Sequence, residues 1–320
     1  MQYRTLGRSA LQVSPLCLGG NVFGWTADQA TSFSILDAFI AGGGRMIDTA
    51  DVYSAWAPGN HGGESESVIG AWLAARGRRD DVLIATKVGM ELDGAKGLAP
   101  ARIAKAIDAS LRRLQTDYVD LYFAHKDDPE TPLADTLAAF DRLVEAGKAR
   151  VIGASNYDAA RLEQALDISA EKRFATYTVL QPWYNLLERQ KFEGPLQDLC
   201  VARNVAAVPY YGVASGFLTG KYRSAADVAG KARSRAVEKY LNDFGLGVLG
   251  ALDTVAKQTG GTPAQIALAW LAAQPAVAAP IASATSIQQL EELLGAMRLT
   301  LTPEQLSLLN AASNPPDQSR

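Results

Sequence analysis

The sequence predicts an α/β fold, a single (β/α)8 TIM barrel with a short N-terminal β-hairpin. Eight short apolar runs, rich in β-branched and aromatic residues, are typical of parallel strands that are buried on both faces. Amphipathic helical stretches separate the runs, and 320 residues are enough for eight such units in one domain. We therefore expect residues 1–320 to form one barrel domain, with a loose polar tail from about residue 313.

The eight expected strands follow one another along the whole chain. They cover residues 16–20, 46–50, 82–87, 118–125, 151–156, 178–182, 205–210 and 277–282. Between two of them, Ile103, Ile107 and Leu111 recur at helical spacing. Two later helices are predicted by the pattern Thr-Pro-x-Gln, which begins at Thr262 and Thr302 and is typical of an N-cap, a first-turn proline and a capping-box glutamine.

The alternative fold for this pattern is a doubly wound open sheet. That fold usually opens with a glycine-rich phosphate loop, G-x-G-x-x-G, directly after the first strand. Here GGNVFGW follows Leu18, and its glycines do not have that spacing. The sequence therefore favours the closed barrel.

The N-terminal segment predicts the hairpin, with Gly7 at its turn and Leu11 and Val13 alternating after it. The segment has neither the charged start nor the apolar core of a secretory signal. Only two cysteines are present, Cys17 and Cys200, which argues against a disulfide framework. Together these observations predict a cytoplasmic protein.

Composition excludes several classes of function. The chain has 31 Lys and Arg against 34 Asp and Glu, so it lacks the basic excess typical of nucleic-acid binders. No apolar run approaches the roughly 18 residues of a membrane helix. With two cysteines and two histidines, His61 and His125, a cysteine-based zinc site and a three-histidine metal site are excluded. We expect no nucleic acid, membrane or metal partner.

Titratable side chains fall at the ends of three successive expected strands. Asp48, Lys87 and His125 lie there, and Tyr53 lies in the loop after Asp48. The carboxyl ends of barrel strands all meet at one face, where barrel enzymes carry their active sites. A buried Lys87 and a buried Asp48 would each need a partner, so we expect them to pair.

This set of residues permits a specific chemistry. A Lys87 ammonium beside Tyr53 would lower the pKa of the phenol, and Asp48 would hold that ammonium and keep it charged. His125 would offer a ring N–H to a substrate oxygen. Such a site can polarise a carbonyl and protonate the resulting alkoxide, but the hydride must come from a nicotinamide cofactor.

Several segments resemble the aldo-keto reductase family. In chain order they read MIDTADVYS, GGESESVIG, IATKVG, DYVDLYFAH, RVIGASNY, QPWYNLLER, GFLTGKY and SIQQLEELLGA, and the similarity runs from residue 6 to about residue 308. The resemblance implies an NAD(P)-dependent oxidoreductase that reduces an aldehyde, ketone or sugar carbonyl to an alcohol, or catalyses the reverse. It implies Tyr53 as proton donor, Lys87 and Asp48 as the groups that tune it, and His125 as the group that orients the carbonyl.

The resemblance also implies which residues hold the nucleotide. The reacting centre is approached by Gly20 and Asn21, and the carboxamide is held by Ser155, Asn156 and Gln181. The nicotinamide ring is stacked on by Tyr210. The pyrophosphate is enclosed by a loop that contributes Tyr211, Val213, Ser215, Gly216, Leu218 and Lys221, and the adenosine end is contacted by Ser283, Thr285 and Gln289.

Two departures from the family pattern concern the nucleotide. The seventh expected strand ends Tyr-Tyr-Gly-Val at residues 210–213, where the family often has Tyr-Ser-Pro-Leu. No Lys or Arg lies between Ser283 and Gln289, where a basic residue often grips the 2′-phosphate of NADP. The resemblance favours NADP(H), and NAD(H) stays possible.

Three tryptophans, Trp25, Trp56 and Trp183, lie in expected loops at the same end of the barrel. Aromatic walls with a few polar anchors are typical of small-molecule sites, so we expect these residues to line the substrate pocket. Such walls suit a small aldehyde, ketone or sugar. His61 lies in the glycine-rich loop near Tyr53, where we expect it to be exposed.

Two other functions are compatible with the same residues. A barrel lyase could use Lys87 to form a Schiff base, but this needs a neutral amine, which a paired Asp48 would oppose. A non-catalytic regulatory subunit could keep the fold and the cofactor without turnover. The sequence carries no signal for oligomeric state.

Overall fold

The computed structural model describes residues 2–228 and 234–314, and its centre is one parallel eight-stranded sheet. Its strands are β3 (Cys17–Gly19), β4 (Met46–Asp48), β5 (Leu83–Val88), β6 (Val119–Ala124), β7 (Ala149–Ser155), β8 (Tyr177–Gln181), β9 (Ala206–Ala207) and β10 (Ile281–Ala282). They pair in the order β10-β3-β4-β5-β6-β7-β8-β9. The Ala207 amide donates to the Ala276 carbonyl at 2.7 Å, and the Ala278 amide donates to the Ala207 carbonyl at 2.8 Å. These bonds join the two ends of the sheet and confirm the predicted (β/α)8 barrel.

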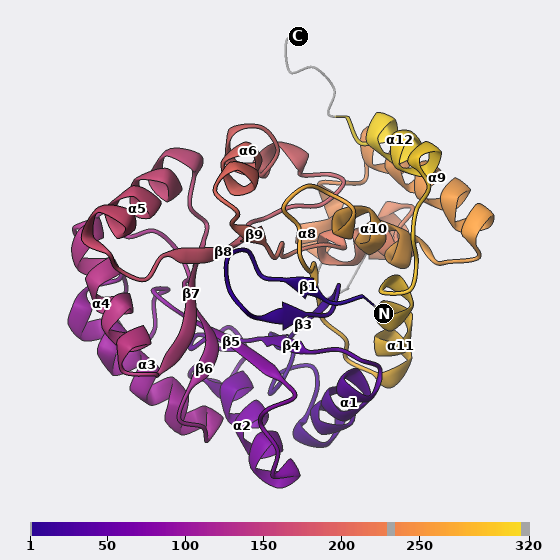
Figure 1. Ribbon diagram of the computed structural model, residues 1–320. Helices are drawn as coiled ribbons and strands as arrows, with labels where there is room; N and C mark the ends of the chain where they lie inside the picture. The colour runs from indigo at the N-terminus through magenta and orange to yellow at the C-terminus, as the bar shows by residue number, and fades with distance from the viewer. Residues whose placement is uncertain (1, 229–233, 315–320) are drawn as a thin grey trace.

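Helices surround the ring of strands (Figure 1). The longer ones are α1 (Gln29–Ala41), α2 (Glu64–Arg76), α3 (Pro100–Leu114), α4 (Leu133–Glu145), α5 (Ala159–Lys172), α6 (Pro195–Ala202), α9 (Asp243–Thr259), α10 (Pro263–Ala272), α11 (Ile287–Ala296) and α12 (Pro303–Ala312). Shorter turns are η1 (Arg189–Lys191), η2 (Ala214–Thr219), α7 (Ala225–Val228) and α8 (Ser234–Glu238). Within the described ranges, no helix has both the length and the apolar character needed to cross a membrane.

The predicted hairpin is present as β1 (Arg4–Thr5) and β2 (Gln12–Val13), paired antiparallel. Leu6, Leu11 and Val13 are buried in one cluster with inward-facing strand residues such as Met46, so the hairpin plugs the amino-terminal end of the barrel. Gly7 lies at the turn with a φ of 54°, and a Cβ there would lie 2.4 Å from the Thr178 carbonyl oxygen. Glycine is therefore required both by the backbone conformation and by this close approach.

The last two strands are shorter than the sequence pattern predicts. Residues 205–210 yield only Ala206–Ala207, and residues 277–282 yield only Ile281–Ala282. Each expected strand contains a proline, Pro209 or Pro280, which has no N–H to donate to a ladder. The chain still follows the barrel here, because the Ile281 amide donates to the Pro209 carbonyl at 2.8 Å.

The predicted helix starts are confirmed, since α10 and α12 both open with a complete capping box, at Thr262 and Thr302. Ile103 and Ile107 are fully buried on α3, as their spacing predicts. Ser313, where the loose tail is expected to begin, is buried and donates to the Leu309 carbonyl at 2.7 Å. Residues 315–320 of that expected tail lie outside the described residues.

Candidate active site

Three strands and one loop bring the four predicted titratable side chains together at the carboxyl face of the barrel. Lys87 Nζ, on β5, donates to Asp48 Oδ2 on β4 at 2.7 Å and to the Tyr53 hydroxyl at 3.0 Å. Lys87 also donates to the Thr49 carbonyl at 2.7 Å. The ring of His125, which follows β6, lies edge-on to the Tyr53 ring with 5.9 Å between centroids.

The ion pair that the sequence predicts is present and is removed from water. The side chain of Lys87 is 0% exposed and that of Asp48 is 4% exposed. Burial alone would lower the pKa of Lys87, but the Asp48 carboxylate and the Tyr53 hydroxyl outweigh it, so the pKa of the ammonium is raised. Gln181 Nε2 donates to Asp48 Oδ1 at 2.8 Å, so both oxygens of the carboxylate have a partner.

The pKa of Tyr53 differs from the expectation. The sequence argument has Lys87 lowering it, whereas the pKa of the phenol is raised above its ordinary value. The cause is burial, which disfavours the phenolate by more than the neighbouring ammonium favours it. Lys87 therefore moderates the pKa of Tyr53 without bringing it below the usual range, and the phenol keeps its proton at neutral pH.

His125 is a neutral imidazole in this setting. Burial and then the charge of Lys87 hold its pKa well below the usual range. Its Nδ1 is buried and has no hydrogen-bond partner among the residues that the structure describes. A neutral ring carries one N–H, so His125 can donate one hydrogen bond to a substrate oxygen.

The residues expected to hold a carboxamide form a linked cluster at the ends of β7 and β8. Ser155 Oγ donates to the Gln181 carbonyl at 2.9 Å, and Asn156 Nδ2 donates to the His125 carbonyl at 2.9 Å. The Tyr210 hydroxyl donates to Asn156 Oδ1 at 2.7 Å. One N–H of Gln181 Nε2 is used towards Asp48, so Gln181 can offer a ligand its amide oxygen and its second N–H.

The parallel strands β3 and β10 end side by side. Ser283 Oγ donates to Asn21 Oδ1 at 2.5 Å. The Gly20 amide donates to the Asp48 carbonyl at 2.7 Å, and a Cβ at Gly20 would lie 3.0 Å from both that oxygen and Ser65 Oγ. The backbone at Gly20 therefore packs tightly against the strand that carries Asp48.

The loop at residues 211–221 contains an unusual run of left-handed backbone. Positive φ values occur at Tyr211 (58°), Ser215 (58°) and Gly216 (97°). Such conformations can gather backbone N–H groups into an anion cradle, but here the amides of Ala214, Gly216 and Leu218 donate to carbonyls of the same loop at 2.8, 2.8 and 3.2 Å. Leu218 is buried in the core, so it can reach a ligand only through its backbone, and Val213 packs partly buried against the same core.

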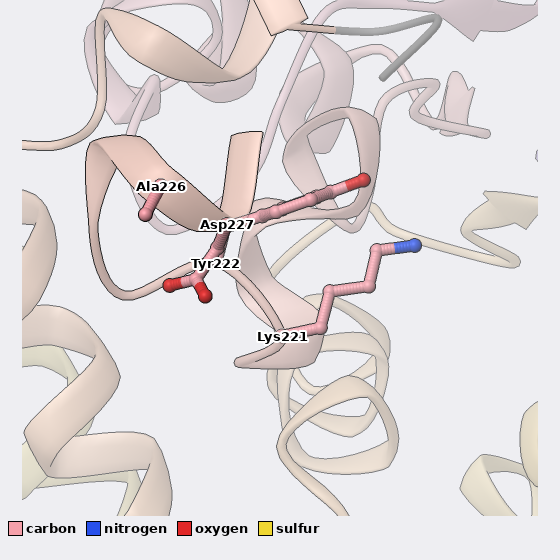
Figure 2. A pocket seen from close by; sticks show the side chains of 4 residues that line it. All are labelled: Lys221, Tyr222, Ala226 and Asp227. Carbon is pink, nitrogen blue, oxygen red and sulfur yellow. The ribbon is translucent and has the colours of Figure 1, made fainter. Parts of the chain in front are cut away.

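Lys221 ends that loop beside a cavity of about 460 Å³ lined by Lys221, Tyr222, Ala226 and Asp227. In Figure 2 the Lys221 ammonium and the Tyr222 hydroxyl extend to the same side, whereas the Asp227 carboxylate points elsewhere. Asp227 accepts from the amides of Arg223 and Ser224 at 2.9 and 2.8 Å. Lys221 makes no ion pair with any described residue, and a Cβ at Gly216 would lie 3.5 Å from its Nζ.

Two of the three residues expected at the adenosine end, Thr285 and Gln289, lie at the start of α11, whereas Ser283 follows β10. Gln289 Oε1 accepts from the Thr285 amide at 2.9 Å and from Thr285 Oγ1 at 3.1 Å. Ser286 caps the helix by accepting from the Gln289 amide. The sequence analysis missed Ser286, although a serine directly before a helical stretch is a recognised N-cap signal.

Aromatic side chains form two groups around the candidate active site. On one side, the rings of Trp25 and Trp56 are 5.8 Å apart, and those of Trp56 and Tyr53 are 5.5 Å apart. On the other side, Trp183 lies 5.2 Å from Tyr211. Trp56 is 47% exposed and Tyr211 is 50% exposed, so both present apolar surface to an incoming molecule.

Not every feature near these groups could be expected from the sequence. The Thr49 carbonyl that accepts from Lys87 carries no sequence signal, because every residue has a carbonyl. His61 is exposed, as expected for its loop. Among the described residues, no group of three His, Cys, Asp or Glu could hold a metal ion, and Cys17 and Cys200 are both buried and unpaired.

Comparison with known proteins gives a consistent result. Residues 15–314 match the family model described as "Aldo/keto reductase family". The chain is 35% identical over 321 residues to "Uncharacterized oxidoreductase YrpG" of Bacillus subtilis (strain 168), covering 97% of this chain and 95% of that protein. It is 32% identical to "Probable voltage-gated potassium channel subunit beta" of Oryza sativa subsp. japonica, covering 97% and 96%. It is also 32% identical to "Protein tas" of Escherichia coli (strain K12), covering 97% of each chain.

Proposed function

This chain belongs to the aldo/keto reductase family, and from that premise we propose that it reduces a carbonyl to an alcohol, or catalyses the reverse, with NADP(H) as the favoured cofactor. The observation that supports the proposal best is the buried chain of hydrogen bonds from Asp48 through Lys87 to the Tyr53 hydroxyl. It places a protonated phenol, held by a charged amine, at the carboxyl face of the barrel, where barrel enzymes act.

In this proposal Tyr53 is the proton donor. Its hydroxyl gives its proton to the substrate oxygen as that oxygen becomes an alkoxide, and the raised pKa of Tyr53 keeps the proton in place until then. Lys87 Nζ, 3.0 Å away, stabilises the phenolate that is left, and Asp48 balances the charge of Lys87. His125 donates one hydrogen bond to the carbonyl oxygen and orients it.

The residues present fit a nicotinamide nucleotide. A carboxamide amino group would donate to the amide oxygen of Gln181, beside Ser155 and Asn156. The loop of residues 211–221 would take the pyrophosphate mainly through the Lys221 ammonium, which lies beside a cavity. When bound, the cofactor supplies the hydride that no side chain can provide.

Lys221 gives this proposal its first test. Lys221→Ala should weaken the binding of NADPH and NADH by the same factor, about tenfold or more, because the pyrophosphate is common to both and a charge-assisted hydrogen bond is lost. Fluorescence titration of each nucleotide measures both dissociation constants. Lys105→Ala, an exposed lysine on α3, is the matched control. A loss confined to NADPH would contradict the pyrophosphate assignment and indicate a contact with the 2′-phosphate.

Trp56, whose ring packs against that of Tyr53, gives a second prediction. Trp56→Ala should raise the KM for an aromatic aldehyde about tenfold and leave the nucleotide dissociation constant nearly unchanged, because the lost ring is exposed and lies 5.5 Å from the ring of Tyr53. Steady-state kinetics and nucleotide titration measure the two effects. Tyr3→Ala removes an exposed aromatic ring next to the amino-terminal hairpin and is the control. An unchanged KM would show that Trp56 does not line the pocket.

The proposal as a whole is tested by titrating NADPH and NADH and then assaying a panel of aldehydes, ketones and sugars with the tighter nucleotide. Tight binding without turnover of any carbonyl would instead support a non-catalytic subunit, a reading favoured by the name of the rice relative. A Schiff-base lyase would be revealed by borohydride trapping of substrate on Lys87. The three hydrogen bonds and the raised pKa of Lys87 oppose that reading, because they hold the amine in its charged form.

A further inference from the structure

A cluster of ionisable side chains lies between the barrel and helices α2 and α3, next to the segment that carries Tyr53. We call it the Asp51 cluster; its members are Asp51, Glu66 on α2, Arg102 and Arg113 on α3, and Tyr122 on β6. The charges of Glu66, Arg102 and Arg113 all act on Asp51, and all four act on Tyr122. None of these residues belongs to the set that the proposed reaction uses.

Glu66 is the fully satisfied carboxylate of the Asp51 cluster. It is completely buried, and Arg113 Nη2 lies 2.6 Å from its Oε2. Its other oxygen accepts from Thr86 Oγ1 at 2.5 Å. The guanidinium of Arg113 is therefore committed to Glu66.

Asp51, by contrast, forms no ion pair with any residue that the structure describes. It is 2% exposed, and its Oδ1 is buried with no hydrogen-bond partner among the described residues. The Tyr122 hydroxyl and Arg102 Nε of the same cluster are likewise buried and unpartnered within that part of the chain. Burial outweighs what the Val52 amide and the charges of Arg102 and Arg113 offer the carboxylate, so its uncharged form is favoured. Burial, followed by the charge of Glu66, raises the pKa of Asp51 to about 7.

The backbone of Asp51 connects this cluster to the candidate active site. Its amide donates to the carbonyl of Lys87 at 3.2 Å, the same residue whose ammonium donates to the Thr49 carbonyl at 2.7 Å. Two residues later, the Tyr53 amide donates to the Ala50 carbonyl at 3.1 Å. Residues 49–53 are thus one tightly bonded turn with Asp51 at its middle and Tyr53 at its end.

Building on the proposed reaction, we propose that Asp51 is a positioning residue: while its carboxyl is uncharged, residues 49–53 keep the Tyr53 hydroxyl on Lys87, and loss of its proton displaces that hydroxyl and slows proton donation. An ionised Asp51 would be drawn towards water or Arg102 and repelled by Glu66. Since its backbone is bonded to Lys87, such a movement would pass directly into the turn that ends at Tyr53.

The first test is the pH dependence of a single turnover, measured with saturating nucleotide. The wild-type rate should fall about tenfold or more from pH 6 to pH 9, because nearly all Asp51 is ionised at the higher pH. Asp51→Asn mimics the uncharged carboxyl, so its rate at pH 6 should match the wild type and the alkaline fall should disappear. Asp80→Asn, an exposed carboxyl in the turn after α2, should keep the wild-type profile. An alkaline fall in Asp51→Asn equal to that of the wild type would overturn the proposal.

The second test does not depend on turnover. In protein labelled with ¹³Cζ-tyrosine, the signal assigned to Tyr53 by its absence in Tyr53→Phe should move with a midpoint near pH 7 in the wild type and stay still in Asp51→Asn. A Tyr53 signal that moves alike in both proteins would overturn the link between Asp51 and Tyr53. If the Tyr53 signal responds to Asp51 but no carbonyl is reduced, the positioning holds and the proposed function fails.

Discussion

Replacing Tyr53 with phenylalanine should lower the rate of carbonyl reduction by about 10²–10⁴-fold, the usual contribution of a positioned proton donor. The change removes one oxygen and keeps the ring, whose contacts with Trp56 and His125 do not involve the hydroxyl. Lys87 loses one hydrogen bond but keeps those to Asp48 Oδ2 and the Thr49 carbonyl. The fold and the nucleotide affinity should therefore be nearly unchanged.

Single-turnover decay of NADPH absorbance measures the rate for Tyr53→Phe, and fluorescence titration measures the nucleotide affinity. The matched control is Tyr3→Phe, which removes the same atom from an exposed tyrosine near the N-terminus. Tyr3→Phe should reduce carbonyls at the wild-type rate. If Tyr53→Phe did so as well, Tyr53 would not be the proton donor. If it lost nucleotide binding instead, Tyr53 would act on the cofactor and not on the substrate oxygen.

The barrel could be predicted because each of its local signals is strong. Continuous apolar runs and the Thr-Pro-x-Gln patterns at Thr262 and Thr302 depend only on neighbouring residues. The parallel strands and the two capping boxes that they predict are present in the structure. The lengths of β9 and β10 could not be read from apolar runs alone. Pro209 and Pro280 interrupt the ladder there, and the closure is completed by backbone bonds that side chains do not encode.

The candidate site could be predicted in part, for a similar reason. The rule that barrel sites form at strand ends identifies Asp48, Lys87 and His125, because it depends only on where strands stop. The direction of the Tyr53 pKa could not be predicted, since it depends on a balance between burial and the charge of Lys87. Asp51 was overlooked because it lies three residues from Asp48, and only the folded turn shows that the two carboxyls belong to different clusters.

The buried ion pair should dominate the stability of the candidate site. Lys87→Met would leave the Asp48 carboxylate buried without its cation, and breaking a buried pair in this way costs about 3–5 kcal/mol of the free energy of unfolding. Urea unfolding of Lys87→Met measures the loss. Lys105→Met, which alters an exposed lysine on α3, is the control and should unfold almost as the wild type does.

The pH dependence and a double variant separate this charge effect from a loss of packing. In Lys87→Met the stranded Asp48 would hold its proton more tightly in the folded state than in the unfolded state, where its pKa is about 3.9. A raised folded pKa gives stability that is present below the unfolded value and is lost as the pH rises through the folded value. The deficit should therefore be small near pH 4 and grow towards pH 8.

Lys87→Met with Asp48→Asn removes both charges and should recover much of the lost stability at pH 8, because Gln181 can still donate to the amide oxygen. A deficit that is equal at both pH values, or a double variant less stable than Lys87→Met alone, would show that packing and not the unpaired charge accounts for the loss.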